Sequence, residues 1–232
     1  MQLKLDNIHK SFGSGENKNE VLKGISCTIE SGSICVLLGP SGSGKSTLLN
    51  IIGGIETADE GSITIGEEIL AEMSEKKLSL YRRKHLGYVF QAYNLVPDLT
   101  VKENIEVGAY LSDHPMAMDD LLHMLGLWEH QDKMPNQLSG GQQQRTSIGR
   151  AIIKQPDILL CDEPTGALDY KTSKDILNLI ELVNRTCGNT VVMVTHNDAL
   201  RLMADQVIRL RDGAVRSDSK NASRTPVDAL EW

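Results

Sequence analysis

The chain has 232 residues and a formal net charge of −7, with 40% hydrophobic and only 4% aromatic residues. The acidic balance and the scarcity of aromatic side chains argue against nucleic-acid binding as the main activity, so no nucleic-acid partner is expected. The sequence has no run of about 18 apolar residues and no signal-peptide core at its start, which favours a cytoplasmic protein of one domain, or of one domain with an inserted lobe.

Two strands are expected near the start of the chain, over residues 2–9 and 20–30. The loop between them is polar and rich in glycine, and it contains Phe12. An isolated aromatic side chain can stack on the base of a nucleotide, or it can fill a small core. Both alternatives stay open on sequence alone.

The run GPSGSGKST at residues 39–47 fits the phosphate-binding P-loop. An apolar run at 34–38 predicts a buried strand before it, and the residues from 48 to 52 can begin a helix after it. Glycines let backbone N–H groups turn toward an anion, and the helix N-terminus adds a partial positive charge. Lys45 supplies a full charge to the outer phosphates, and the Ser46 hydroxyl can ligate magnesium. The candidate phosphate-binding residues are Gly39, Pro40, Ser41, Gly42, Ser43, Gly44, Lys45, Ser46 and Thr47.

A short strand at 60–66, a solvated basic helix at 74–85 and a strand at 86–90 are expected next. The last of these strands stops at Gln91, a polar residue at a strand end, where ligands often meet a sheet. From residue 91 to about residue 150 the pattern becomes helical, beginning with a capping box at Thr100 and Glu103. The sequence therefore predicts a helical lobe inserted into an α/β core.

The run LSGGQQQR at 138–145 predicts another helix start, with Ser139 and Gln142 as its capping box. Gly140 and Gly141 in the first turn each cost about 1 kcal/mol of helix stability relative to alanine. A helix start that accepts this cost suggests that something approaches its backbone closely, and an anion is the physical candidate.

Two adjacent carboxylates, Asp162 and Glu163, follow an apolar strand at 158–161. Desolvating two negative charges is costly unless a cation or a reaction uses them. Asp162 suits magnesium, and Glu163 suits the positioning or deprotonation of a water molecule.

The strand expected at 190–195 also ends in a polar residue, His196, and Asn197 can cap the short helix that follows. A lone histidine is more often structural than catalytic, but this one repeats the strand-end placement of Gln91 and Asp162, which favours a functional role. A strand at 207–210 closes the domain. Residues 217–232 are polar and are expected to be a mobile tail.

These motifs, in this order, resemble the nucleotide-binding subunit of ATP-binding-cassette (ABC) transporters over about residues 2–213. The most diagnostic piece is 138–145, which is similar to the family signature LSGGQ. Residues 89–97 and 162–169 are similar to one branch of the family, which includes macrolide exporters, lipoprotein-release ATPases and antimicrobial-peptide resistance transporters.

The resemblance implies an α/β fold: a P-loop NTPase (RecA-like) core with an N-terminal antiparallel β subdomain and an inserted α-helical subdomain. It implies an ABC ATPase domain at 1–216, with the core at 1–90 and 150–216, the helical subdomain at 91–149 and the tail at 217–232.

The resemblance also implies ATP and Mg²⁺ as cofactors and a homodimer that sandwiches two ATP molecules, each between the P-loop of one cassette and the signature helix of the other. Catalysis is implied for Glu163, His196 and Gln91, and metal contact for Ser46, Gln91 and Asp162. Nucleotide contact is implied for Phe12, the P-loop, Ser139, Gly140, Gly141, Gln142 and Asp169. Closure of the dimer would drive a separate permease at the inner face of the cell membrane, for export or extraction of an antimicrobial peptide, drug or lipoprotein.

Two alternatives are weighed against this hypothesis. A regulatory cassette that signals through a membrane partner without transport is equally compatible with the sequence. A soluble cassette of DNA repair or translation is disfavoured, because those chains carry a long coiled coil or two cassettes. The permease contact is expected between Gln91 and about Tyr110. There, Tyr93, Leu95, Val96 and Leu99 either form a hydrophobic cleft next to Gln91 or tuck into the helical lobe.

Overall fold

The computed structural model describes residues 1–232, apart from the side chain of Glu16. The strands are β1 (Leu3–Phe12), β2 (Asn19–Ile29), β3 (Ile34–Leu38), β4 (Glu60–Ile65), β5 (Glu68–Ile69), β6 (Leu86–Val89), β7 (Ile158–Asp162), β8 (Thr190–Thr195), β9 (Gln206–Arg211) and β10 (Ala214–Lys220). The α-helices are α1 (Lys45–Ile52), α2 (Glu75–His85), α3 (Val101–Ala109), α4 (Met118–Leu125), α5 (Gly140–Ile152) and α6 (Tyr170–Cys187). Short 3₁₀ helices are η1 (Gly15–Asn17), η2 (Leu70–Glu72), η3 (Trp128–His130), η4 (Pro135–Gln137), η5 (Asp198–Met203) and η6 (Val227–Ala229).

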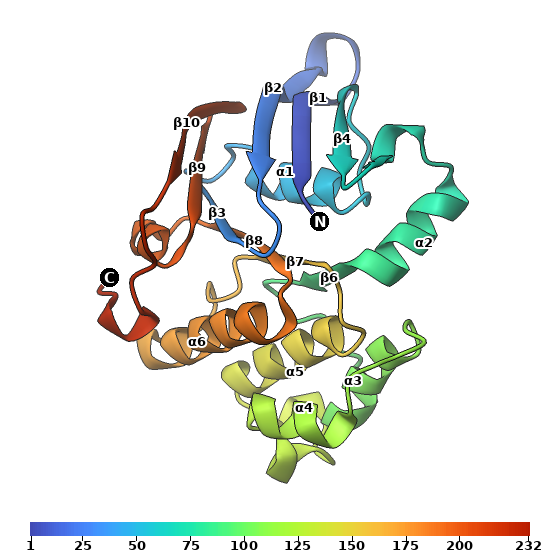
Figure 1. Cartoon of the computed structure of the whole chain (residues 1–232), viewed down its shortest axis with the longest axis vertical. Helices are drawn as coiled ribbons and strands as arrows, with labels where there is room; N and C mark the ends of the chain where they lie inside the picture. The colour runs from blue at the N-terminus through green and yellow to red at the C-terminus, as the bar shows by residue number, and fades with distance from the viewer.

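Two sheets form the body of the molecule, with α1 between them (Figure 1). The first is antiparallel, in the order β2-β1-β4-β5. The second has the order β10-β9-β3-β8-β7-β6 and is parallel except for the edge strand β10. Because β3, β6, β7 and β8 run in the same direction, their carboxyl ends lie along one edge, which is where a ligand meets a sheet of this kind.

Both faces of the second sheet are covered, and β3 shows how the sequence produces this. Ile34, Val36 and Leu38 pack into the apolar cluster that contains α5 and α6, whereas Cys35 and Leu37 pack into the cluster that contains α1 and the antiparallel sheet. Successive side chains of a strand point to opposite faces, so an unbroken apolar run is needed where both faces are buried.

The helical part of the chain lies on the far side of this sheet, where α3 and α4 pack beneath α5 (Figure 1). Both predicted capping boxes are present, at the starts of α3 and α5. The leucines of α4, Leu121, Leu122 and Leu125, are buried. The expected fold class is confirmed, although the predicted boundary at residue 150 falls inside α5, which runs from Gly140 to Ile152 and joins the two parts.

The expectation of a mobile tail needs correction. Residues 217–220 belong to β10, and both Val227 and Leu230 are only 1% exposed against the cluster that contains α6. The composition of 217–232 is polar on average, but two apolar side chains three positions apart are enough to anchor the segment. No helix in the described part of the chain combines the length and the apolar character needed to cross a membrane.

Candidate functional site

The P-loop is shaped by glycines with positive φ. Gly42 has φ +78° and Gly44, the N-cap of α1, has φ +94°, a region that side chains with a Cβ rarely adopt. Lys45 Nζ donates to the carbonyls of Gly39 and Pro40, at 2.8 and 3.0 Å. The buried Ser43 Oγ has no hydrogen-bond partner among the described residues. These donors around a helix N-terminus suit an anion such as a phosphate.

A cleft of about 750 Å³ opens in front of the P-loop. Its lining residues are Asn19, Val21, Ser41, Gly42, Gly44, Lys45, Ser46, Thr47, Gln91, Asp162, Glu163, Val194 and His196. The polar residues at three predicted strand ends, far apart in the sequence, therefore converge on one space beside the P-loop. That volume lies in the range typical of small-molecule and cofactor sites.

Ser46 and Asp162 meet at the floor of this cleft, where Ser46 Oγ donates to Asp162 Oδ1 at 3.0 Å. Burial raises the pKa of Asp162, and Glu163 adds to this, while the Ser46 hydrogen bond and Lys45 act in the opposite direction. Burial also lowers the pKa of Lys45, against the effect of Glu163 and Asp162. A hydroxyl and a partly desolvated carboxylate, side by side, form an oxygen donor pair that fits a magnesium ion.

Glu163 follows β7 in the left-handed region, with φ +46°, and its N–H donates to the Val194 carbonyl. Its carboxylate contacts His196, whose Nδ1 lies 2.8 Å from Glu163 Oε1. The Glu163 side chain is 15% exposed and the His196 side chain 69%. The two adjacent carboxylates thus have different partners, as their different predicted roles require.

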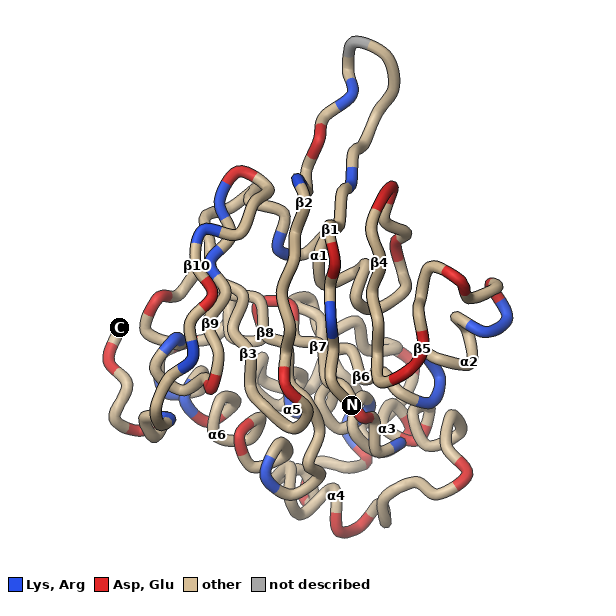
Figure 2. Tube along the Cα trace, turned by 45° about the horizontal axis from the view of Figure 1, so that its top comes forward, with Lys and Arg blue, Asp and Glu red and all other residues tan. Residues whose placement is uncertain are grey.

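Phe12 lies outside the cleft lining, at the base of the β1–β2 loop that projects beyond the sheets (Figure 2). Its side chain is 44% exposed, so it does not fill a core. Lys10 Nζ lies 5.3 Å from the ring centroid, within cation–π distance. The structure therefore excludes the alternative of a core residue for Phe12. It leaves an aromatic face exposed, which is the alternative that allows stacking on a base.

The signature residues Ser139, Gly140, Gly141 and Gln142 and the predicted contact Asp169 also lie outside the cleft. Ser139 caps α5 and Asp169 caps α6. The glycines have a packing reason within the chain: a Cβ on Gly141 would collide with Thr172 Cγ2, and one on Gly140 would lie 3.0 Å from Tyr93 Oη. The close approach that the sequence predicts at the start of α5 is therefore made in this structure by side chains of the same chain, Thr172 and Tyr93.

The segment after Gln91 is held by an arginine that the sequence did not single out. Tyr93 and Asn94 have φ +58° and +51°, and the Arg150 guanidinium donates to both of their carbonyls, at 3.0 and 2.6 Å. Burial lowers the pKa of Arg150. The end of α5 thus binds the backbone that follows Gln91, in a conformation that costs free energy for residues other than glycine.

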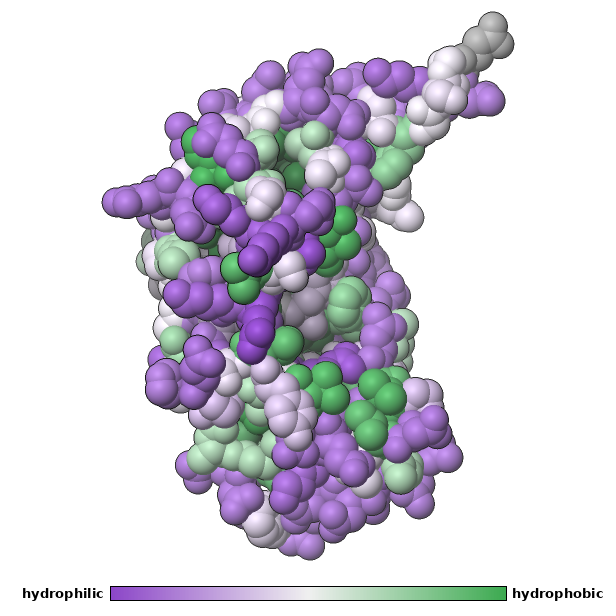
Figure 3. Space-filling model, turned by 90° about the vertical axis from the view of Figure 1, so that its right-hand side faces the viewer, coloured by the Kyte–Doolittle hydropathy of each residue, from purple (hydrophilic) through white to green (hydrophobic). Residues whose placement is uncertain are grey.

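The expected apolar surface between Gln91 and Tyr110 is exposed only in part. Of Tyr93, Leu95, Val96 and Leu99, only Val96 is exposed, and the other three are partly buried. Three more exposed apolar side chains lie around the end of α3: Val107 is 41% exposed, Tyr110 72% and Leu111 40%. Val107 and Leu111 line a hollow of about 370 Å³ together with Leu86, Gly87, Tyr88, Phe90, Asn94, Gly108, Arg150, Ala151 and Lys154. Figure 3 views this side and shows apolar residues gathered beside a hollow in the middle of the face.

Two residues of the cleft wall, Asn19 and Val21, were also missed. The signal that could have found Asn19 is register: it pairs with Phe12 across the β1–β2 hairpin. Their position depends on how the antiparallel sheet leans over α1, which no short motif encodes.

Comparison with known proteins places the chain in a family. The model of the family described as "ABC transporter" matches residues 22–166. The chain is 42% identical to the putative ABC transporter ATP-binding protein MG065 of Mycoplasma genitalium, over 99% of this chain and 50% of that protein. It is 44% identical to the bacitracin export ATP-binding protein BceA of Halalkalibacterium halodurans, over 92% of this chain and 86% of that protein.

Among solved structures, the chain is similar to the dimeric post-hydrolysis state of the ATP-binding cassette MJ0796 bound to ADP and Pi. The TM-score is 0.85 at 38% identity, covering 94% of this chain and 98% of that one. The chain belongs to the ABC transporter family and has the fold of its ATP-binding cassettes. It spans about half the length of the Mycoplasma relative.

Proposed function

We propose that this chain hydrolyses ATP as one half of a two-cassette sandwich, and that the cycle drives a membrane permease from its cytoplasmic side. The observation that carries the proposal is the convergence of Lys45, Ser46, Asp162, Glu163 and His196 on one cleft. BceA is a bacitracin export ATP-binding protein, and this supports export or extraction of an antimicrobial peptide, drug or lipoprotein as the work performed.

In this proposal the P-loop N–H groups and Lys45 hold the phosphates, and the free face of Phe12 stacks on the adenine. Ser46, Asp162 and Gln91 supply oxygen ligands for Mg²⁺, which would neutralise charge on the phosphates. No group of three or more histidine, cysteine or acidic side chains is placed to hold a metal among the described residues. Such a sparse protein shell is typical of magnesium bound mainly through nucleotide phosphates and water.

Glu163 accepts the proton of the attacking water, and His196 orients the Glu163 carboxylate through the 2.8 Å contact of Nδ1 with Oε1. Glu163 lines the same cleft as the P-loop residues, which would hold the phosphates. Its left-handed backbone is a strain of the kind that marks functional sites.

The signature residues lie outside this cleft, so they would bind the nucleotide of a second cassette. The experiment uses Glu163→Gln, which removes the base and retains ATP binding. ATP should shift this variant from monomer to dimer in sedimentation, and Ser139→Arg in the same background should prevent the shift by blocking the start of α5. Ser112→Arg, in the loop after α3, is the matched control. A dimer that ignores both ATP and Ser139→Arg would overturn the sandwich.

The hollow beside Val107 and Leu111 is the proposed contact with the permease, since it borders the backbone held by Arg150 after Gln91. Val107→Asp with Leu111→Asp should leave ATP binding intact and abolish the response of ATPase activity to the permease. Leu182→Asp, at a similarly exposed position on α6, should retain that response. Full stimulation of the double variant would place the permease contact elsewhere.

A further inference from the structure

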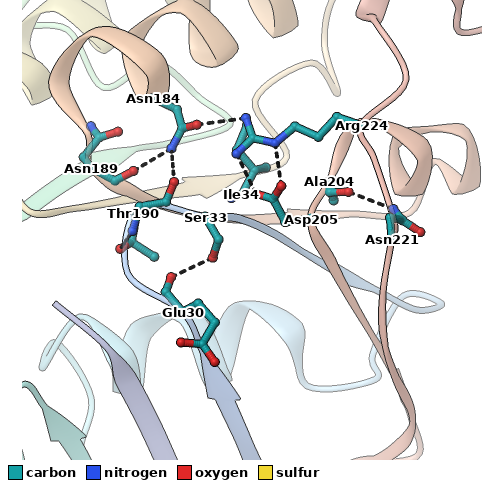
Figure 4. Close-up of polar contacts among 11 residues, drawn as sticks. Glu30, Ser33, Ile34, Asn184, Asn189, Thr190, Ala204, Asp205, Asn221 and Arg224 are labelled. Carbon is teal, nitrogen blue, oxygen red and sulfur yellow. Dashed lines mark hydrogen bonds and ion pairs between the residues drawn. The ribbon is translucent and has the colours of Figure 1, made fainter.

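The segment 221–232, called the strap below, is fastened at its first end to the amino end of β3 and to the last turns of α6. Arg224 donates to both carboxylate oxygens of Asp205, at 2.8 and 2.5 Å, and to Asn184 Oδ1 at 2.9 Å (Figure 4). Asp205 Oδ2 also accepts the N–H of Ile34 at 2.7 Å. Asn221 Nδ2 adds bonds to the carbonyls of Arg201 and Ala204.

At its other end, the strap is bound to the first turns of α6. Leu230 is 1% exposed, and its carbonyl accepts a hydrogen bond from Tyr170 Oη at 3.1 Å. Lys174 Nζ donates to the Asp228 carbonyl at 2.9 Å. The Trp232 ring lies 4.8 Å from the Tyr170 ring. The strap therefore spans α6 from its end to its beginning, and its last contacts are with the first helical residue.

The N-cap of that first turn, Asp169, is one of the predicted nucleotide contacts. Asp169 caps it by accepting Thr172 N–H at 3.0 Å and Thr172 Oγ1–H at 2.6 Å. Thr172 Cγ2 is also the atom that leaves no room for a Cβ on Gly141. One side chain, Thr172, thus touches both the cap of α6 and the start of the signature helix.

We propose that the strap is a positioning element for the closed sandwich: Leu230 and Tyr170 hold the first turn of α6, and through Thr172 they set the placement of Asp169 and Gly141. The proposal rests on the two-cassette function proposed above. The strap does not touch the P-loop cleft, so its loss should affect contact with the second cassette and spare binding of ATP to the first. A structural role alone would lower stability without affecting dimer formation in the folded protein.

The test compares two leucine-to-alanine variants in the Glu163→Gln background. Leu230→Ala removes the anchor of the strap, whereas Leu3→Ala removes an equally buried leucine from the other apolar cluster. Measurements are made where both variants have the native circular dichroism spectrum. With ATP and Mg²⁺, Leu230→Ala should weaken dimerisation in sedimentation by about tenfold, within the range of remote packing effects on coupling. The affinity of the monomer for ATP should change less than about twofold, a small fraction of that effect. Leu3→Ala should dimerise like the parent variant.

Further variants keep the result interpretable if Leu230→Ala does not fold. Tyr170→Phe removes one hydroxyl and should weaken dimerisation by about threefold, as expected for one hydrogen bond. Leu230→Met, which retains an apolar anchor, should restore parental dimerisation. Amide exchange at residues 171–173 should accelerate in Leu230→Ala and stay parental in Leu3→Ala.

Two outcomes would overturn the inference, and they differ. If the parent variant dimerises and Leu230→Ala and Tyr170→Phe dimerise as tightly, only the role of the strap is wrong. If the parent variant itself fails to dimerise with ATP, the sandwich is wrong and the strap's role falls with it.

Discussion

The nucleotide cleft and the strap hold their charged groups in opposite ways. In the cleft, burial raises the pKa of Asp162 and lowers the pKa of Lys45, so both shifts favour the neutral forms. At the strap, burial acts on Asp205 in the same direction, but the hydrogen bonds from Arg224 and Ile34 outweigh it, and its pKa is lowered. The charges of the cleft are incompletely satisfied by the chain, whereas the Arg224–Asp205 pair at the strap is satisfied within the chain.

This contrast separates the sources of affinity and of stability. A cleft whose charges lack full partners gains free energy when a charged ligand supplies them, and the folded state is then stabilised by binding. A strap whose charges are paired contributes to the stability of the ligand-free fold. Substitutions in the cleft should therefore change catalysis and ligand affinity, whereas substitutions at the strap should change the stability of the ligand-free fold. The effects should also differ in size.

The largest effect is expected for Glu163, the proposed general base in the cleft. Glu163→Gln should lower the turnover number for ATP by about a thousandfold, the typical contribution of a positioned general base, and leave ATP affinity close to that of the parent. Steady-state phosphate release and equilibrium nucleotide binding measure the two quantities. Glu181→Gln, a partly buried glutamate on α6, is the control. Turnover within a few-fold of the parent would contradict the assignment of Glu163.

Replacing Lys45, the cationic side chain of the cleft, should have the next largest effect, and this effect should be on ATP binding. Lys45→Ala should weaken ATP affinity by about a hundredfold, as for the loss of charge-assisted hydrogen bonds to phosphate. It should also remove most of the rise in melting temperature that ATP with Mg²⁺ produces. The control Lys102→Ala, exposed on α3, should behave like the parent. Unchanged affinity in Lys45→Ala would place the phosphates elsewhere.

The same contrast explains which parts of the molecule the sequence could predict. Lys45, Ser46, Asp162, Glu163 and His196 were found because each stands directly at a strand or loop end, and a parallel sheet brings such ends together. That inference needs only short-range patterns and the direction of the strands. The convergence on one cleft follows from the fold class.

The strap and Arg150 were not predictable by this route. The contacts of Arg224 with Asp205 and Asn184 join residues 19 and 40 positions apart, and they depend on where α6 ends relative to β3. Average polarity predicts solvation, but it cannot show that Val227 and Leu230 have a groove to fill. Arg150 likewise has its role because the backbone after Gln91 turns back onto the end of α5.

At the strap, the expected effect is on stability. Arg224→Gln should lower the free energy of unfolding by about 2 kcal/mol, as for hydrogen bonds to a charged partner. Arg216→Gln, which breaks an exposed 3.6 Å pair with Asp212, should cost about 0–1 kcal/mol. Urea titration of the ATP-free protein measures both. Equal losses would mean that the Arg224 network is no stronger than a surface ion pair.

The pH dependence of the free energy of unfolding shows where the Asp205 carboxylate, paired with Arg224, stabilises the fold. Because the pKa of Asp205 is lower in the folded state than in the unfolded state, its contribution is complete above its ordinary pKa. This stabilisation is lost as the pH falls through the pKa of Asp205 in the folded state, because the unfolded chain takes up the proton at a higher pH. Arg224→Gln should therefore flatten this acid limb of the stability profile.

The smallest effect is expected for Asp162, and its sign is opposite. Its folded pKa is raised, so between the unfolded and folded values the native state binds more protons, and stability falls as the pH rises through this window. Asp162→Asn removes that cost and retains an oxygen that can accept from Ser46. The ATP-free variant should gain about 1 kcal/mol at neutral pH, the usual size of a single stabilising substitution, and lose much of its stabilisation by ATP with Mg²⁺. Asp205→Asn is the matched control and should destabilise the ATP-free protein. If Asp162→Asn also destabilises it, the cleft carboxylate is satisfied within the chain, and the contrast between the two regions is wrong.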